Sequence, residues 1–303
     1  MADRPPAFEP GRYGSVRPPR AGTGSSGTWV GPLPPSRDTE VVGRDASSSL
    51  EDEPTFVASV DEERVAATRP NGTSSRPPQA PAPRAIVNVE SVTIEPKDAR
   101  AVLALDPDGE RAASFRVLAQ RVGRGREGKG AVLVASAEAG EGKSTCALNL
   151  ALALAEPDRA RVALLEANFR APSLAKILGV APRVCFGQQL AMRRQQPWAD
   201  WYLQQALIPS FHFACIHPET APRGLVDAAP LGLAVRALLA DGFAHVIVDG
   251  PSVLHQADAN LAQEMVHGVV LAARARVSKG SLLRRAVDQL GVDRVIGAVL
   301  VDC

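Results

Sequence analysis

The chain has 303 residues, 45% of them hydrophobic, and a formal net charge of +1 at pH 7. This near balance gives no overall electrostatic bias toward nucleic acid or an anionic membrane, so we expect no nucleic-acid partner. The four cysteines are far apart without a CxxC pair, and no stretch approaches the roughly 18 apolar residues of a membrane span. A zinc site, a disulfide framework and a membrane helix are therefore not expected, and the protein is predicted to be cytoplasmic.

Residues 1–84 are predicted to form a disordered tail. The segment is rich in proline, serine and glycine, with pairs such as Pro5-Pro6 and Pro77-Pro78. Such a composition buries too little apolar surface to offset the entropy lost on ordering. The tail is either a flexible tether or a docking segment with short recognition motifs, and the sequence leaves both open.

Residues 85–129 are interpreted as an arm and a helix that precede the core. Residues 85–105 alternate in part, which predicts a short strand or an extended arm packed on the domain. Residues 109–122 place Phe115, Leu118 and Val122 on one helical face. The basic connector GRGREGKG then predicts a solvated loop, with contact to phosphates as the alternative.

From residue 130 to residue 303, short apolar runs alternate with amphipathic stretches. This rhythm predicts an α/β fold with a mainly parallel β-sheet flanked by helices. The expected strands cover residues 131–135, 161–165, 211–216, 245–248, 268–272 and 295–301. The expected helices cover residues 143–155, 231–241, 257–265 and 279–290. The segment 184–209 is less regular, and its aromatics Trp198, Trp201 and Tyr202 suggest a helix packed on the core or, alternatively, a partner surface.

The strongest motif is AEAGEGKST, which follows the apolar run VLVAS and opens the helix CALNLALALA. Glycines at 140 and 142 let the backbone curl, so that its N–H groups point at phosphate oxygens. Lys143 then reaches the β and γ phosphates, and Ser144 presents its hydroxyl to Mg²⁺. The strict pattern would need glycine where Ala137 stands, and the alternative is an ordinary helix-start turn. The motif predicts that residues 130–303 are a P-loop nucleotide-binding domain, with the nucleotide bound together with magnesium.

Two acidic positions accompany this loop. Asp249 follows the apolar strand at 245–248, so its carboxylate is expected at the edge of the sheet as a metal ligand; the alternative is an Asp that caps a turn. Glu166, Asn168 and Arg170 end the strand at 161–165 and alternate toward one side. Glu166 is expected to orient a water or contact magnesium, and Arg170 to hold the loop or neutralise phosphate charge. The alternative is a polar turn with an internal ion pair.

Six blocks in order resemble the bacterial tyrosine kinases (BY-kinases) and related ATPases of capsule and exopolysaccharide biosynthesis. They are DPDGERAASFRVLAQR, ASAEAGEGKSTCALNLALALA, VALLEANFRAPSL, AHVIVDGPSVLHQADANLA, HGVVLAARA and GAVLVDC. The resemblance implies the family fold, ATP and Mg²⁺ as cofactors, and a polysaccharide co-polymerase or export protein of the inner membrane as partner. The lysine that partitioning and cell-division ATPases carry early in the loop is replaced by Glu138, which points away from them.

By position, the resemblance implies a phosphate-binding loop of Ala139, Gly140, Glu141, Gly142, Lys143, Ser144 and Thr145. It also implies metal ligation by Ser144 and Asp249, and a second acidic site at 166 and 168. Here this chain departs from the family, because Glu166 and Asn168 replace two aspartates. The helix for self-association is also altered at Ala113, Arg116 and Ala119, and the terminal tyrosine cluster is missing, leaving Tyr13 and Tyr202.

Three functions follow as hypotheses. The first is a MgATP-binding, weakly hydrolysing regulator of surface-polysaccharide assembly, with Lys143, Glu166 and Asp249 as catalytic residues. The second is an active protein tyrosine kinase that acts on a separate substrate. The third is a non-catalytic scaffold switched by ATP, in which Asn168 reflects lost chemistry.

Overall fold

The computed structural model describes residues 29–31, 86–123, 130–156, 160–217, 219, 228–254 and 257–301. The predicted disorder of residues 1–84 therefore falls outside the described residues, apart from three residues that form a strand. The connector at 124–129 and Tyr13 also lie outside them.

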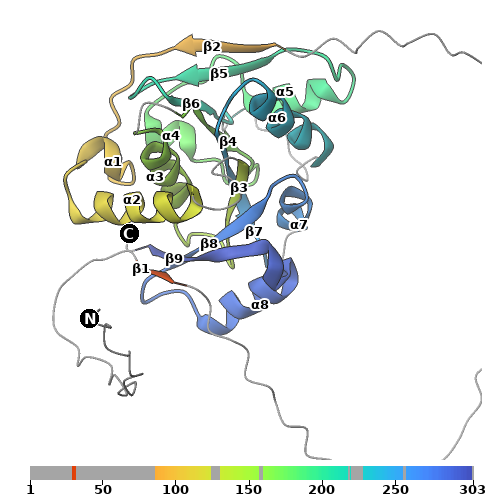
Figure 1. Ribbon diagram of the computed structural model, residues 1–303. Helices are drawn as coiled ribbons and strands as arrows, with labels where there is room; N and C mark the ends of the chain where they lie inside the picture. Colours follow the sequence, from red (N-terminus) through yellow and green to blue (C-terminus); the bar gives the residue numbers. More distant parts are fainter. Residues whose placement is uncertain are drawn as a thin grey trace, which may run out of the picture.

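A nine-stranded, mainly parallel sheet forms the centre of the described molecule (Figure 1). In spatial order its strands are β1 (Trp29–Gly31), β9 (Val295–Val301), β8 (Gly268–Arg274), β3 (Gly130–Ser136), β7 (His245–Ser252), β4 (Val162–Glu166), β6 (Phe211–Ala214), β5 (Trp201–Gln205) and β2 (Val87–Ser91). Only the pairs β1–β9 and β5–β6 are antiparallel among the described strands. The predicted α/β fold with a mainly parallel sheet is confirmed.

Two layers of helices cover the sheet (Figure 1). One layer holds α1 (Val102–Leu105), α2 (Glu110–Gly123), α3 (Lys143–Ala155) and α4 (Leu174–Leu178). The other holds α5 (Phe186–Arg193), α6 (Ala228–Ala240), α7 (Asp258–Gln263) and α8 (Gly280–Leu290), and the short 3-10 helix η2 (Val292–Arg294) leads into β9. Because both faces are covered, the central strands β3, β4 and β7 are buried along most of their length, which explains their continuous apolar runs.

Helix α3 is apolar on nearly all sides because it lies between two layers. It packs on β3, β4 and β7 beneath it and on α1 and α2 above it. Arg116 of α2 forms an ion pair with Glu156, just beyond the end of α3, at 2.6 Å. Arg116, the one arginine of the self-association motif that this chain retains, therefore pairs with a residue of the same chain.

The segment 184–209 differs from the expected single helix. It contains α5 and then β5, in which Trp201 is buried and Tyr202 is half-exposed. The side-chain amide of Gln189 in α5 accepts a hydrogen bond from the Tyr202 N–H at 2.9 Å and donates one to its carbonyl at 3.0 Å. The Gln189 side chain therefore bonds the Tyr202 backbone in the way that a neighbouring strand would. The two residues are 13 positions apart, and no local sequence pattern marks this contact.

The arm at residues 86–101 contains β2, an edge strand of the sheet, and then leads to α1, which packs on α3. Strand β2 pairs with β5, and Val92 continues this pairing by donating to the Gln205 carbonyl at 2.9 Å. Farther on, the side chain of Asn149 in α3 makes hydrogen bonds to Arg100 and Leu103. Each such buried bond contributes about 1 kcal/mol, so the arm is fixed at both ends.

Candidate nucleotide-binding site

The phosphate loop joins β3 to α3 and has the expected left-handed glycines. Gly140 has φ = 81° and Gly142 has φ = 87°, values that side chains disfavour. Gly142 directly precedes α3, and no side chain caps the first turn of this helix. Its N-terminal N–H groups and positive dipole end are therefore suited to an anion.

A cavity of about 460 Å³ opens beside this loop. Seven predicted residues line it: Ala139, Gly140, Gly142, Lys143, Ser144, Thr145 and Arg170. Asn168, which the sequence placed near this loop, lines it too. The remaining lining residues, which no motif marks, are Arg100, Ala171, Ser173, Ser252 and Arg274. The lining thus carries four basic side chains and no carboxylate, which suits a polyphosphate.

Lys143 lies at the base of the cavity and is only 6% exposed. Burial lowers the pKa of its ammonium group, while the charges of Asp249 and Glu141 oppose that shift. A desolvated ammonium that faces a cavity lined by basic groups is stabilised when an anion enters. The placement fits the predicted contact with phosphates.

Asp249 lies on β7 next to the loop and is completely buried. Within the described structure, neither carboxylate oxygen has a hydrogen bond of regular geometry, although the Ser144 hydroxyl is close enough to act as a weak donor. Burial raises its pKa to about 6, although the nearby Ser144 hydroxyl and Lys143 ammonium act in the opposite direction. A buried carboxylate with unpaired oxygens beside a hydroxyl fits the oxygen ligands that Mg²⁺ prefers. Among the described residues there is no cluster of three His, Cys, Asp or Glu side chains, so phosphates and water would complete the coordination.

The strand that carries Asp249 is longer than expected. β7 continues through Gly250 and Pro251 to Ser252, which pairs with Ser136 after an irregularity in β3. A Cβ atom at position 250 would lie 2.4 Å from the Leu133 side chain. Glycine therefore allows β7 to pass close to β3, and Asp249 is buried within the sheet rather than emerging at its edge.

The carboxylate of Glu166, which the sequence predicted to orient a water or contact magnesium, accepts three backbone hydrogen bonds in this structure. Its Oε1 accepts the N–H groups of Ser173 at 2.5 Å and Leu174 at 2.9 Å, and its Oε2 accepts the N–H of Ile216 at 2.8 Å. The side chain is fully buried and does not line the cavity. Burial raises its pKa to about 7, with a further contribution from Asp249 on the adjacent strand and opposition from the three N–H groups. Its observed partners make it a structural carboxylate that fixes the start of α4.

Asn168 and Arg170 do face the cavity. Asn168 donates through Nδ2 to the Ala171 carbonyl at 3.0 Å, which shapes the turn after β4. Arg170 pairs with the buried Asp258 of α7 at 3.2 Å. The ion pair therefore joins two elements and does not lie within the 166–170 cluster.

Glu141 is buried, and its side chain points away from the predicted phosphate position. One carboxylate oxygen accepts the Glu138 N–H at 2.7 Å, and the other accepts the hydroxyl of Ser278, which itself accepts the Arg274 N–H at 2.8 Å. Glu141 therefore connects the phosphate loop to the turn after β8. Its backbone remains the part of the residue suited to phosphate.

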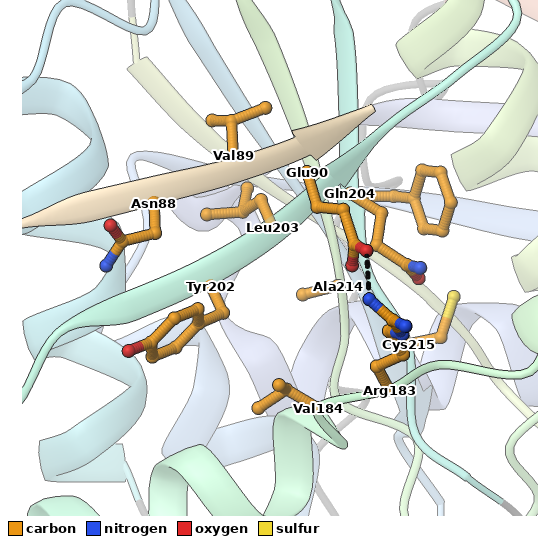
Figure 2. A pocket seen from close by; sticks show the side chains of 11 residues that line it. Asn88, Val89, Glu90, Arg183, Val184, Tyr202, Leu203, Gln204, Ala214 and Cys215 are labelled. Carbon is orange, nitrogen blue, oxygen red and sulfur yellow. Dashed lines mark hydrogen bonds and ion pairs between the residues drawn. The ribbon is translucent and has the colours of Figure 1, made fainter. Parts of the chain in front are cut away.

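A second cavity, of about 350 Å³, lies at the β2 edge of the sheet (Figure 2). Residues of β2, β5 and β6 line it, and the ion pair between Arg183 and Glu90 at 2.7 Å spans it. It forms where β5 and β6 separate, since only Gln204 and Gln205 of β5 pair with β6. Val89, Leu203 and Tyr202 make much of its wall apolar.

Comparison with known proteins agrees with this geometry. A family model described as ParA, NUBPL iron-transfer P-loop NTPase, matches residues 128–214. Among solved structures, the kinase domain of the Escherichia coli tyrosine kinase ETK matches with a TM-score of 0.54 at 16% identity, over 67% of this chain and 79% of that one. The chain has the P-loop NTPase fold of bacterial tyrosine-kinase domains.

Two further structures support this assignment of the fold. The chimerical protein CapA2B2 matches this chain with a TM-score of 0.54 at 18% identity, over 70% of this chain and 92% of that one. The VpsO kinase domain matches with a TM-score of 0.51 at 21% identity, over 68% and 97%. No curated protein matches significantly. Within the described residues, this chain has no helix of the length and apolarity that crossing a membrane requires.

Proposed function

We propose that the chain binds MgATP in the basic cavity, hydrolyses it slowly, and regulates the polymerisation and export of capsular or exopolysaccharide. The observation that carries the proposal is the buried, unpaired carboxylate of Asp249 beside Lys143 and Ser144. Burial of such a carboxylate costs free energy, which the nearby Lys143 ammonium offsets in part and a bound Mg²⁺ would offset further. The resemblance to the BY-kinases supports a cytoplasmic location and an inner-membrane co-polymerase or export protein as partner.

Each residue then has a chemical role. The loop amides and Lys143 neutralise phosphate charge, and Ser144 and Asp249 hold Mg²⁺, which supplies further electrophilic stabilisation when bound. Asn168 and Arg170 lie on the side where β4 ends and are suited to the terminal phosphate. Asp249 is the acidic residue left for metal binding, because Glu166 is occupied by backbone N–H groups.

Phosphate release by the purified full chain tests this proposal, with Lys143→Ala and Asp249→Ala as variants. We expect slow release with MgATP that both variants lose. Release that persists in both would contradict the proposal. Adding a tyrosine-rich peptide separates hydrolysis from the kinase alternative, since a kinase would transfer ³²P to the peptide.

A non-catalytic, ATP-switched scaffold is the second candidate. It is favoured by the neutral Asn168 at the second acidic position and by the full hydrogen bonding of Glu166, which together leave no acidic side chain of the 166–170 turn in the cavity. Tight binding of MgATP without phosphate release or peptide phosphorylation would favour this candidate.

A further inference from the structure

Arg100 lies outside every motif of the sequence, yet it lines the basic cavity together with Lys143 and Thr145. It belongs to the arm that connects β2 to α1 and precedes the phosphate loop by about forty residues. Its side chain is 36% exposed. A cation from another part of the chain thus reaches the mouth of the nucleotide site.

The backbone of Arg100 is fixed to the first turn of α3. The buried Asn149 donates through one nitrogen, Nδ2, to the carbonyls of both Arg100 and Thr145, each at 2.7 Å. Its Oδ1 accepts the Leu103 N–H at 3.0 Å. Because one nitrogen bonds both carbonyls, it holds the Arg100 backbone next to the first turn of α3.

The guanidinium group is also oriented. Asp98 accepts Nε of Arg100 at 2.9 Å and Nη2 at 2.6 Å, together with the Arg100 backbone N–H at 3.0 Å. These hydrogen bonds hold the pKa of Asp98 at about 2, so the pair stays charged at neutral pH. A guanidinium group carries five N–H donors in a planar fork, which allows it to hold a carboxylate and a phosphate oxygen together.

The position of Arg100 within the cavity indicates which phosphate it would meet. The arm that carries Arg100 runs beside α4, since the Glu95 carbonyl oxygen lies 3.8 Å from the place that a Cβ atom on Gly179, at the end of α4, would take. Arg274 lies at the other side, at the end of β8. Lys143 and Asp249 mark the terminal phosphates and the metal, and β7 with Asp249 adjoins β4, which leads to α4. Arg100 is therefore on the terminal-phosphate side.

We propose that Arg100 binds the terminal phosphate of the nucleotide, so that the arm completes the site and distinguishes triphosphate from diphosphate. This inference rests on the proposed binding of MgATP. The arm would then respond to the loss of the γ phosphate, and the response would reach β2 through residues 92–99.

Calorimetric titration of the full chain with the magnesium complexes of a non-hydrolysable ATP analogue and of ADP tests the inference. Arg100→Gln should weaken the analogue about tenfold, as expected for one charge-assisted hydrogen bond, and ADP less than twofold. The matched control is Arg161→Gln, an arginine of similar exposure that pairs with Asp241 at 3.1 Å but precedes β4, at the opposite end of that strand. It should change neither affinity.

A double-mutant cycle separates positioning from general stability. Asp98→Asn should also weaken the analogue, but it should add little to the loss in Arg100→Gln, because Asp98 orients the Arg100 guanidinium group. Additive losses in the double variant would contradict this coupling.

The outcomes distinguish this inference from the proposed function. Wild-type binding of the analogue with an unchanged Arg100→Gln affinity, or with equal losses for analogue and ADP, overturns the role of Arg100 alone. Absence of all nucleotide binding by the wild type overturns the proposed function and, with it, this inference.

Discussion

Two cavities of the described structure, one beside the phosphate loop and one at the β2 edge of the sheet, differ in the charge of their walls. The cavity beside the phosphate loop is lined by Arg100, Lys143, Arg170 and Arg274 without a carboxylate, and it adjoins the unpaired Asp249. In the edge cavity, one arginine meets one glutamate at 2.7 Å and the remaining wall is mostly apolar (Figure 2).

This difference indicates that the cavity beside the phosphate loop is the one suited to a charged ligand. The wall of the first cavity carries only positive charge, because the carboxylates that pair with Arg100 and Arg170 do not line it, and a magnesium polyphosphate would be stabilised there. The edge cavity, with an exposed ion pair over apolar side chains, has no such excess of positive charge. The predictions below test this contrast, beginning with the largest expected effect.

Asp249→Asn should reduce Mg²⁺-dependent phosphate release by at least about 100-fold, because it removes a negatively charged metal ligand where charge develops. Phosphate release at saturating MgATP measures the effect. Lys279→Ala is a suitable control, since Lys279 is exposed beyond β8. A rate of phosphate release in Asp249→Asn equal to that of the wild type would contradict the role of Asp249 as a metal ligand.

The same carboxylate should make the stability of the nucleotide-free protein depend on pH. The pKa of Asp249 is about 6 in the fold against an ordinary value of 3.8, so the folded state holds the proton more tightly between these values. Stability is greatest below about pH 4 for this group and is lost as the pH rises through 6, by about 2–3 kcal/mol. Urea unfolding at pH 5 and pH 8 should show a smaller fall for Asp249→Asn than for wild type; equal falls would contradict the prediction.

Glu166→Gln should affect folding more than chemistry. The amide nitrogen would face a backbone N–H that the carboxylate now accepts, which costs about 2 kcal/mol of unfolding free energy. Phosphate release by the folded variant should stay within about twofold of wild type. A large loss of release with unchanged stability would return Glu166 to a direct catalytic role.

Ser278→Ala should weaken MgATP binding about three- to tenfold, because the hydroxyl connects Glu141 of the loop to the Arg274 backbone. Titration calorimetry measures the change. Ser91→Ala is the matched control, since its hydroxyl bonds Gln205 on the edge strands, far along the sheet. Equal effects of the two substitutions would argue against a specific role for the Glu141 contact.

Arg183→Gln in the edge cavity should have the smallest effect. The pair with Glu90 is exposed, so its loss should cost at most about 1 kcal/mol of stability and leave nucleotide affinity unchanged. Thermal unfolding and MgATP titration check both expectations. A marked loss of nucleotide affinity would show that the two cavities are coupled.

The central fold was predictable because its signals are local. Helix α3 and strand β9 have the predicted bounds, since a glycine-rich loop marks the start of α3 and an apolar run fills β9. Strand β5 was missed because it depends on Gln189 and on pairing with β2, more than a hundred residues earlier.

The site was predictable in its motif but not in its surroundings. Lys143 and Ser144 lie close to Asp249, as the glycine-rich motif and the apolar run before Asp249 predicted, whereas the burial of Asp249 follows from the extension of β7. The role of Glu166 depends on Ile216, fifty residues away, and Arg100 reaches the cavity through Asn149. No spacing in the sequence specifies these contacts.

Direct binding of MgATP to the full chain tests the central claim most directly. Titration calorimetry should show saturable binding at one site per chain, lost in Lys143→Ala and retained in Arg183→Gln. Absence of binding to the wild type, or binding that survives Lys143→Ala unchanged, would contradict the assignment of the basic cavity as the nucleotide site.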